Sequence, residues 1–433
     1  MPKFVKILVA LVVVPLVVAG CKINSINYFP PHPANVRVAN AIPNAAAINV
    51  TVGGNPAFSG LTFETLTGYQ SYDNTTTTFS VSLVGSSTPF LTSSYALAGE
   101  QSYTLVTYGP LNSPATLMLQ DTSVSPGDGK FQLVVANVAP GVGAIDVYLY
   151  PPGTDITNVS PTFTNVTYGT TGVVGNFSTG TYTMTGTLTG TKVLIYDSGP
   201  RTYNGNTETD VIMYSRGSAH LVNVAMLDIN AGGQSVIVNN RLGEVKLVNA
   251  APGIAAPGTI NMLQGGLGVI TGLGYAGASL YTVLPAGTPT YTFEATATPG
   301  ATLATVSTTL IPATDQSIFL TGFPGSEKAV ALIDNNLPPV SGNVRLRFVN
   351  TSPDAGPVDV SVNGTKLVSS LASPTASGYI ELVAGTDTIT FTDSATGATL
   401  LTLSNVILTS GQTSTVYLLG PAASLSGLVS LDT

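Results

Sequence analysis

The chain has 433 residues, of which only 8% are charged, and its formal net charge is −8. Its 46 Gly and 29 Pro residues argue against an all-α protein, because long helices depend on other residue types. No cluster of Lys or Arg is present to neutralise phosphates, so nucleic-acid binding is not expected. The 44% hydrophobic content is sufficient for buried cores. One Cys and two His leave little for a disulfide framework, a thiol nucleophile or a metal site, and we expect no cofactor.

Residues 1–20 have the pattern of an export signal. Lys3 and Lys6 precede an apolar run over residues 7–19, which is shorter than a membrane-spanning helix. The Val-Ala-Gly-Cys stretch that ends at Cys21 resembles the bacterial lipobox, in which the Cys is acylated and the chain is cut before it. We therefore predict a lipoprotein signal peptide and a membrane anchor at Cys21. The alternative is an ordinary secretory peptide.

Residues 21–35 form a Pro-rich segment, which predicts an extended tether after the lipidated Cys. Lys22 occupies the position at which an Asp, in the lipoproteins that this segment resembles, retains the protein at the inner membrane. The sequence therefore favours the bacterial cell envelope, at the outer membrane or the cell surface.

Four copies of one sequence unit follow the tether. Each begins with an apolar strand that ends in Asn-x-x-Pro, at Asn40 and Pro43, Asn137 and Pro140, Asn249 and Pro252, and Asn350 and Pro353. These Asn residues are 97, 112 and 101 positions apart, a spacing that is typical of self-contained β-sandwiches. We predict an all-β chain of four tandem immunoglobulin-like β-sandwich domains, at 36–129, 130–240, 241–340 and 341–433. Short linkers that contain Pro predict a semi-stiff string of separate domains.

Further features recur inside each unit. A second strand carries an Asx residue, at Asn49, Asp146, Asn261 and Asp359, and each unit closes on an Asp, at Asp121, Asp228, Asp334 and Asp432. A middle strand alternates Thr or Ser with apolar residues, which predicts one buried and one wet face.

This combination of motifs resembles the bacterial domain of unknown function 4397 family. The shared features are the Asn-x-x-Pro strand, the Val-Asp-Val strand, the Ala-Gly-Thr turns and the closing Asp. The resemblance implies extracytoplasmic immunoglobulin-like sandwiches, often in tandem in lipoproteins. Copies one and four match best. The family carries no established activity, so the resemblance implies no catalytic residue.

Several residues are candidates for a functional role. The Asn and Pro residues of the motif can bond loop amides and fix a turn, or line a binding surface in a loop, and the structural role is favoured. Asp354 and Asp359 could form a catalytic or calcium-binding carboxylate pair, which is disfavoured because the other repeats do not preserve it. His32 and His220 show no triad partners in sequence, and His220 is expected in a strand.

Arg345 and Arg347 are expected to face solvent.

With no recognisable catalytic group, the sequence predicts a lipid-anchored envelope protein, not an enzyme, that makes protein or carbohydrate contacts as an adhesin or scaffold. One alternative is a periplasmic ligand-binding or hydrolytic protein with a site between domains. The other is a purely structural envelope spacer.

Overall fold

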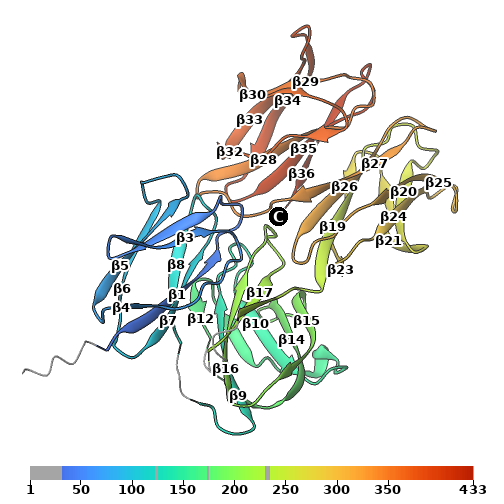
Figure 1. The fold of residues 1–433 in the computed structure, drawn as a ribbon. Helices are drawn as coiled ribbons and strands as arrows, with labels where there is room; N and C mark the ends of the chain where they lie inside the picture. Colours follow the sequence, from blue (N-terminus) through green and yellow to red (C-terminus); the bar gives the residue numbers. More distant parts are fainter. Residues whose placement is uncertain (1–31, 122–124, 173–174, 230–234, 433) are drawn as a thin grey trace, which may run out of the picture.

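The computed structural model describes residues 32–121, 125–172, 175–229 and 235–432, so Cys21 and the signal segment lie outside the described residues. Within these ranges the one helical element is the short 3-10 helix η1 (Ile156–Asn158). The described part of the chain accordingly holds no helix with the length and apolar character of a membrane span. The strands form eight sheets, arranged as four sandwiches that we call repeats 1 to 4 (Figure 1). The prediction of tandem β-sandwiches is confirmed.

Repeats 1 and 2 contain the strands β1 to β18. In repeat 1 one sheet has the order β4 (Gln70–Tyr72), β1 (Ala34–Ala41), β7 (Ser102–Tyr108), β8 (Ala115–Asp121), and the other β3 (Asn55–Leu61), β2 (Ile48–Val52), β5 (Thr76–Leu83), β6 (Leu91–Ala96). In repeat 2 the first sheet has the order β12 (Thr170–Thr171), β9 (Lys130–Asn137), β16 (Thr207–Tyr214), β17 (Asn223–Asp228), β18 (Ser235–Val238), and β13 (Gly175–Ser178) also pairs with β9. The second sheet has the order β11 (Phe163–Val166), β10 (Ile145–Tyr150), β14 (Gly180–Leu188), β15 (Leu194–Tyr203).

Repeats 3 and 4 follow the same plan. In repeat 3 the first sheet has the order β22 (Gly277–Ala278), β19 (Leu242–Asn249), β26 (Asp315–Thr321), β27 (Lys328–Asp334), and β23 (Thr282–Pro285) also pairs with β19. The second sheet has the order β21 (Leu267–Gly274), β20 (Thr259–Gln264), β24 (Thr290–Ala295), β25 (Thr302–Ser307). In repeat 4 the first sheet has the order β31 (Thr375–Ala376), β28 (Asn343–Asn350), β35 (Thr413–Leu419), β36 (Ser426–Leu431), and β32 (Ile380–Val383) also pairs with β28. The second sheet has the order β30 (Thr365–Leu371), β29 (Val358–Val362), β33 (Gly385–Asp393), β34 (Thr399–Leu408).

One sheet of each repeat contains its first strand, β1, β9, β19 or β28, and we call it the first-strand sheet. There the first strand pairs in parallel with β7, β16, β26 or β35. Parallel strands are usually buried on both faces, and both strands of these pairs are buried along most of their length. The inner face packs in the core of its own sandwich, and the outer face packs on another repeat.

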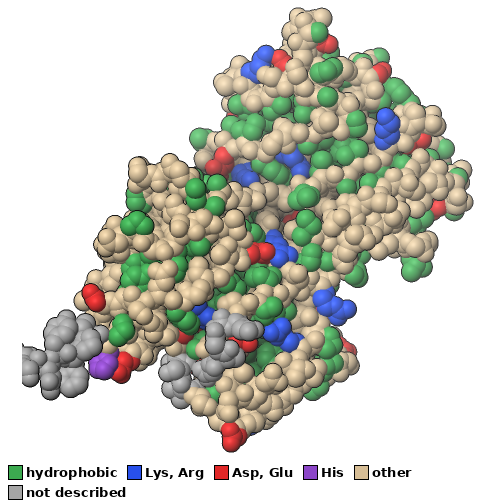
Figure 2. All heavy atoms as spheres, viewed as in Figure 1, with side chains coloured by type: hydrophobic (Ala, Val, Ile, Leu, Met, Phe, Trp, Pro, Cys, Tyr) green, Lys and Arg blue, Asp and Glu red, His purple; other side chains and the backbone are tan. Residues whose placement is uncertain are grey.

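Two apolar clusters join the repeats in pairs through the outer faces of these sheets. Between repeats 1 and 2 the cluster includes Tyr108, Val106, Ile212 and Tyr214, and between repeats 3 and 4 it includes Val248, Phe319, Val349, Tyr417 and Leu419. The predicted string of separate domains is therefore wrong. The linkers are short and the outer sheet faces are apolar, so burial of these faces favours a packed body. Figure 1 shows the repeats grouped around the middle of the molecule. In the same view, Figure 2 shows Lys and Arg side chains scattered over this face.

Candidate functional site at the junction of the repeats

The Asn of each Asn-x-x-Pro motif is buried and bonds to backbone. Its amide donates to two backbone carbonyls of its own repeat, as in Asn350 to Gly356 O at 2.9 Å and Leu371 O at 3.1 Å, and its oxygen accepts from the amide two residues on, here Ser352 N at 3.2 Å. Asn40, Asn137 and Asn249 make the same three contacts. Pro43 and Pro140 are buried, and Pro252 and Pro353 are half-buried. These Asn side chains are occupied by their own loops and are not on the surface.

The Asx residues of the second strands also bond to backbone. Each accepts an amide hydrogen bond from a residue at positive φ in the neighbouring strand, Asn49 from Gly60, Asp146 from Asn165, Asn261 from Gly272 and Asp359 from Ser370, at 2.8 to 2.9 Å. The register shifts beside these residues, so each Asx secures a β-bulge.

Asp354 and Asp359, the candidate carboxylate pair, have separate partners. Asp354 is exposed and accepts from Ala422 N at 2.7 Å. Asp359 bonds to Lys366, Ser394 and Ser370, and the hydrogen bond from Lys366 holds the pKa of its carboxyl below the ordinary value. Both carboxylates are therefore engaged in hydrogen bonds within their own repeat.

The expectation that Arg345 and Arg347 face solvent is wrong. Arg347 is 3% exposed, and its guanidinium lies 2.7 Å from Asp334 of repeat 3, while Arg345 is half-buried and bonds to Leu337 O. Lys246 of repeat 3 pairs in the opposite direction with Asp432 of repeat 4. The two ion pairs cross the interface between repeats 3 and 4, and each buried charge has a partner in the other repeat.

At the equivalent strand positions between repeats 1 and 2, Arg37 is the single cation, and a less buried ion pair, Arg216 with Glu64, also crosses this interface. Arg37 lies 3.4 Å from Asp121 of its own repeat, and Asp121 accepts from Thr104 and Tyr69. Repeat 2 contributes Asp210, whose carboxyl accepts no hydrogen bond in the described structure. Burial and the charge of Asp121 raise its pKa well above the ordinary value. Repeat 2 thus places an acid with a raised pKa close to Asp121 and Arg37.

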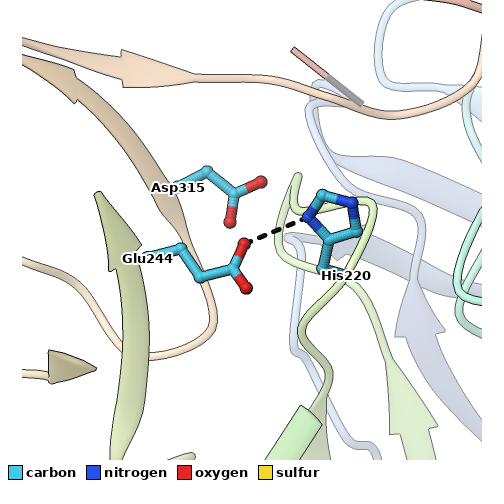
Figure 3. A group of neighbouring side chains, drawn as sticks. All are labelled: His220, Glu244 and Asp315. Carbon is cyan, nitrogen blue, oxygen red and sulfur yellow. Dashed lines mark hydrogen bonds and ion pairs between the residues drawn. The ribbon is translucent and has the colours of Figure 1, made fainter. Parts of the chain in front are cut away.

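The junction of repeats 2 and 3 brings together three side chains that the sequence did not connect. His220 lies in the loop between β16 and β17, not in the expected strand, and its Nδ1 is 3.1 Å from Glu244 Oε2 on β19. Asp315, at the start of β26, faces the same point (Figure 3). The ligand atoms of all three lie within 4.8 Å of one another. His32, by contrast, forms an exposed pair with Glu100 at 2.7 Å.

Burial and neighbouring charges shift the pKa values of His220 and Asp315. The hydrogen bond to Glu244 raises the pKa of His220, in spite of the opposing effect of its partial burial. Complete burial, followed by the charge of Glu244, raises the pKa of Asp315 to about 8. Asn336 donates to one Asp315 oxygen at 2.8 Å, and the other oxygen has no hydrogen-bond partner.

An apolar pocket of about 370 Å³ opens beside this cluster. His220 and Glu244 line it, together with aliphatic side chains from three repeats: Leu188, Val193, Leu194 and Ile195 of repeat 2, Leu280 and Val283 of repeat 3, and Leu431 of repeat 4. Leu280 is 88% exposed and Val193 55%. Exposed aliphatic groups that gather at one place are typical of an interaction surface.

A second pocket, of about 360 Å³, is lined by residues of repeats 1 and 4 and of the end of repeat 3, and includes Pro43 of the repeat motif. Its charged groups already have partners: Glu381 accepts from Asn112 and from Val340 N, and Arg345 donates to Leu337 O. The pocket beside His220 is the stronger candidate, because its exposed apolar groups adjoin the cluster in which buried Asp315 has an oxygen without a hydrogen-bond partner.

The fold and its motifs define a chain of tandem β-sandwich repeats whose first-strand sheets pack on one another. The chain belongs to the family described as Domain of unknown function (DUF4397), whose model matches residues 34–148, 243–361 and 350–433. The matches leave out residues 149–242, which make up most of repeat 2. No similar sequence was found among curated proteins.

Some solved structures show a distant likeness. The carbohydrate-binding module CBMbc (family CBM26) of Eubacterium rectale Amy13K, solved with maltoheptaose, is 11% identical, with a TM-score of 0.18 over 48% of this chain and 96% of that chain. The Bacillus anthracis TIE protein is 11% identical, with a TM-score of 0.15 over 87% and 69%. BcpA, the major pilin subunit of Bacillus cereus, is 12% identical, with a TM-score of 0.14 over 67% and 99%. At these scores the likeness carries no inference about function.

Proposed function

We propose that this protein is a lipid-anchored protein of the bacterial cell envelope that binds a protein partner, without catalysis, in the apolar pocket beside His220. The lipobox ending at Cys21 and the Pro-rich tether support the anchor, and Lys22 supports an outer-membrane or cell-surface location. The observation that carries the binding proposal is the pocket itself, because three repeats contribute exposed aliphatic side chains to it.

A protein partner fits this pocket better than a carbohydrate. Sugar rings stack on aromatic faces and take hydrogen bonds from polar side chains, whereas the lining here is mainly Leu, Ile and Val. The one aromatic residue in the lining, Tyr281, already donates its hydroxyl to Asp334 at 2.5 Å. A buried apolar centre with a polar rim is the usual form of a protein interface. The occupant that we propose is an apolar side chain of the partner.

The absence of catalysis is supported by two serine hydroxyls of this region, one two residues before His220 in the chain and the other in the lining of the pocket. Ser218 Oγ accepts the backbone amides of His220 and Leu221, and Ser279 Oγ donates to Leu280 O and accepts from Leu247 N. Both hydroxyls are engaged with backbone, and a nucleophile would have to leave those bonds.

A hydrolytic protein with a site between repeats is the second candidate. It is favoured by the imidazole of His220, which lies beside two carboxylates at the edge of a pocket. The two functions differ in turnover. Under the binding proposal the wild type hydrolyses no substrate, and under the hydrolytic one it does and His220→Ala loses that turnover.

A site-specific photo-crosslinker tests the binding proposal. In envelope-anchored protein, benzoylphenylalanine at position 280 should form an adduct with one partner, whereas the same group at Leu267, which is 77% exposed in the same repeat and outside the pocket, should not. Leu280→Asp should abolish copurification of that partner, and Leu267→Asp should not. Equal adducts from both positions would reject the pocket as the binding site.

The anchor is tested separately. Cys21→Ser should abolish labelling by a fatty-acid analogue and release the protein from the membrane fraction. Retention of the variant in membranes would reject the lipoprotein assignment and leave the pocket proposal standing.

A further inference from the structure

The acid pair of the His220 cluster is specific to repeat 3. Glu244 and Asp315 are register partners on the parallel strands β19 and β26. The equivalent partners in repeats 1, 2 and 4 are Asn35 and Ser102, Gln132 and Glu208, and Arg345 and Thr413. The fold therefore does not require two carboxylates at this position, and their presence in repeat 3 needs another explanation.

The two carboxylates also lack the cation with which three other buried acids of this protein pair. Asp121, Asp334 and Asp432 each pair with Arg or Lys. Over the described ranges, no Lys or Arg forms an ion pair with Glu244 or Asp315, and His220 is the one basic group beside them. Asp315 is completely buried, and one of its oxygens has no hydrogen-bond partner. Such a group is costly unless a cation satisfies it.

The atoms at the cluster match the preferences of zinc. An imidazole nitrogen and two carboxylate oxygens are common Zn²⁺ ligands, at about 2.0 to 2.2 Å from the ion. Two ligands at a tetrahedral angle then stand about 3.3 Å apart, and His220 Nδ1 and Glu244 Oε2 are 3.1 Å apart. Because His220 and Glu244 also line the pocket, an ion can enter from solvent and keep a water as its fourth ligand. Figure 3 shows the three side chains facing one another.

We propose that His220, Glu244 and Asp315 form a binding site for one divalent transition-metal ion, with Zn²⁺ as the probe. His220 comes from repeat 2 and the two acids from repeat 3, so the ion ties these repeats together beside the pocket. The metal site stands on this side-chain geometry and does not depend on the proposed protein partner.

Calorimetric titration with ZnCl₂ tests the site, on the chain without its first 21 residues after removal of metal by chelator. We expect one Zn²⁺ per chain and an affinity at least 100-fold lower in His220→Ala and in Asp315→Asn. His32→Ala is the matched control, because it removes the imidazole of a His–carboxylate pair that has no second acid, and it should bind as the wild type does. Absence of stoichiometric binding, or binding unchanged in both site variants, would overturn the proposal.

Thermal unfolding provides an independent readout for variants whose fold is in question. Zn²⁺ should raise the unfolding midpoint of the wild type and of His32→Ala, because a ligand that binds the native state stabilises it. It should leave the midpoint of Asp315→Asn unchanged, because this variant lacks one of the proposed carboxylate ligands. Asn at this position keeps an oxygen that accepts from Asn336, so the local hydrogen bond is preserved. An equal rise in Asp315→Asn would place the ion elsewhere and contradict the proposal.

Discussion

The interface between repeats 1 and 2 and the one between repeats 3 and 4 use the same outer sheet face but balance their charges differently. In the second interface Lys246 and Arg347 each meet an Asp of the other repeat. In the first, Val134 occupies the position of those cations, three residues before the motif Asn, and Arg37 lies near both Asp121 and Asp210, whose pKa burial raises. The same sheet face therefore holds its buried acids either in ion pairs or with a raised pKa.

The largest effect should follow from removal of a cation between repeats 3 and 4. Arg347→Met leaves Asp334 buried beside Tyr281 and Ser317 without its counter-charge. We expect a loss of about 3 to 5 kcal/mol in the free energy of unfolding, measured by chemical denaturation. The control is Lys366→Met, which breaks a more exposed ion pair with Asp359 and should change stability within experimental error. Similar losses in both variants would show that burial at the interface is not decisive.

A pH-dependent effect of intermediate size should arise at the other interface. The folded pKa of Asp210 is raised, so its contribution to stability is complete below the unfolded pKa and is lost as pH rises through the folded value. Asp210→Thr introduces the residue that repeats 1 and 4 carry at this position. Its unfolding midpoint should exceed that of the wild type at pH 8, and the gap should narrow toward pH 5. A gap that is constant over this range would contradict a raised pKa of Asp210.

The smallest effect should come from restoring the missing cation. Val134 is half-buried and is the register partner of Asp210, so Val134→Arg places a guanidinium beside that carboxyl. An adjacent positive charge lowers the pKa of an acid. The stability of this variant, followed by thermal unfolding, should depend less on pH between 6 and 8 than that of the wild type. Unchanged pH dependence would show that a guanidinium at position 134 does not interact with the Asp210 carboxyl.

The sequence predicted the sandwiches well, because alternation and the Asn-x-x-Pro motif are local patterns that recur four times. The sequence also suggested that Asp228 is equivalent to Asp121, Asp334 and Asp432. Asp121 pairs with Ser102, whose equivalent in repeat 2 is Glu208. Asp228 pairs instead with the next residue, Thr209. A shift of one residue turns a side chain to the opposite face. Asp228 is accordingly half-buried and bonds to Thr209.

The interfaces and the candidate site could not be read from local patterns. Lys246 and Asp432 are 186 positions apart, and no spacing rule connects two repeats that pack through sheet faces. A signal was nevertheless present: Arg37, Lys246 and Arg347 interrupt apolar strands at the same position. A charge in a strand buried on both faces requires a partner. His220 and Glu244 are close in sequence but belong to different repeats, so their contact depends on how those repeats pack.

The packing of the four repeats into one body is the central claim, since the pocket and the His220 cluster exist only where repeats meet. Small-angle X-ray scattering of the chain without its first 21 residues measures it directly. A packed body of this length should have a radius of gyration of about 22 to 26 Å. A radius near twice that value, with the profile of an elongated particle, would show separate domains on a string and contradict the account.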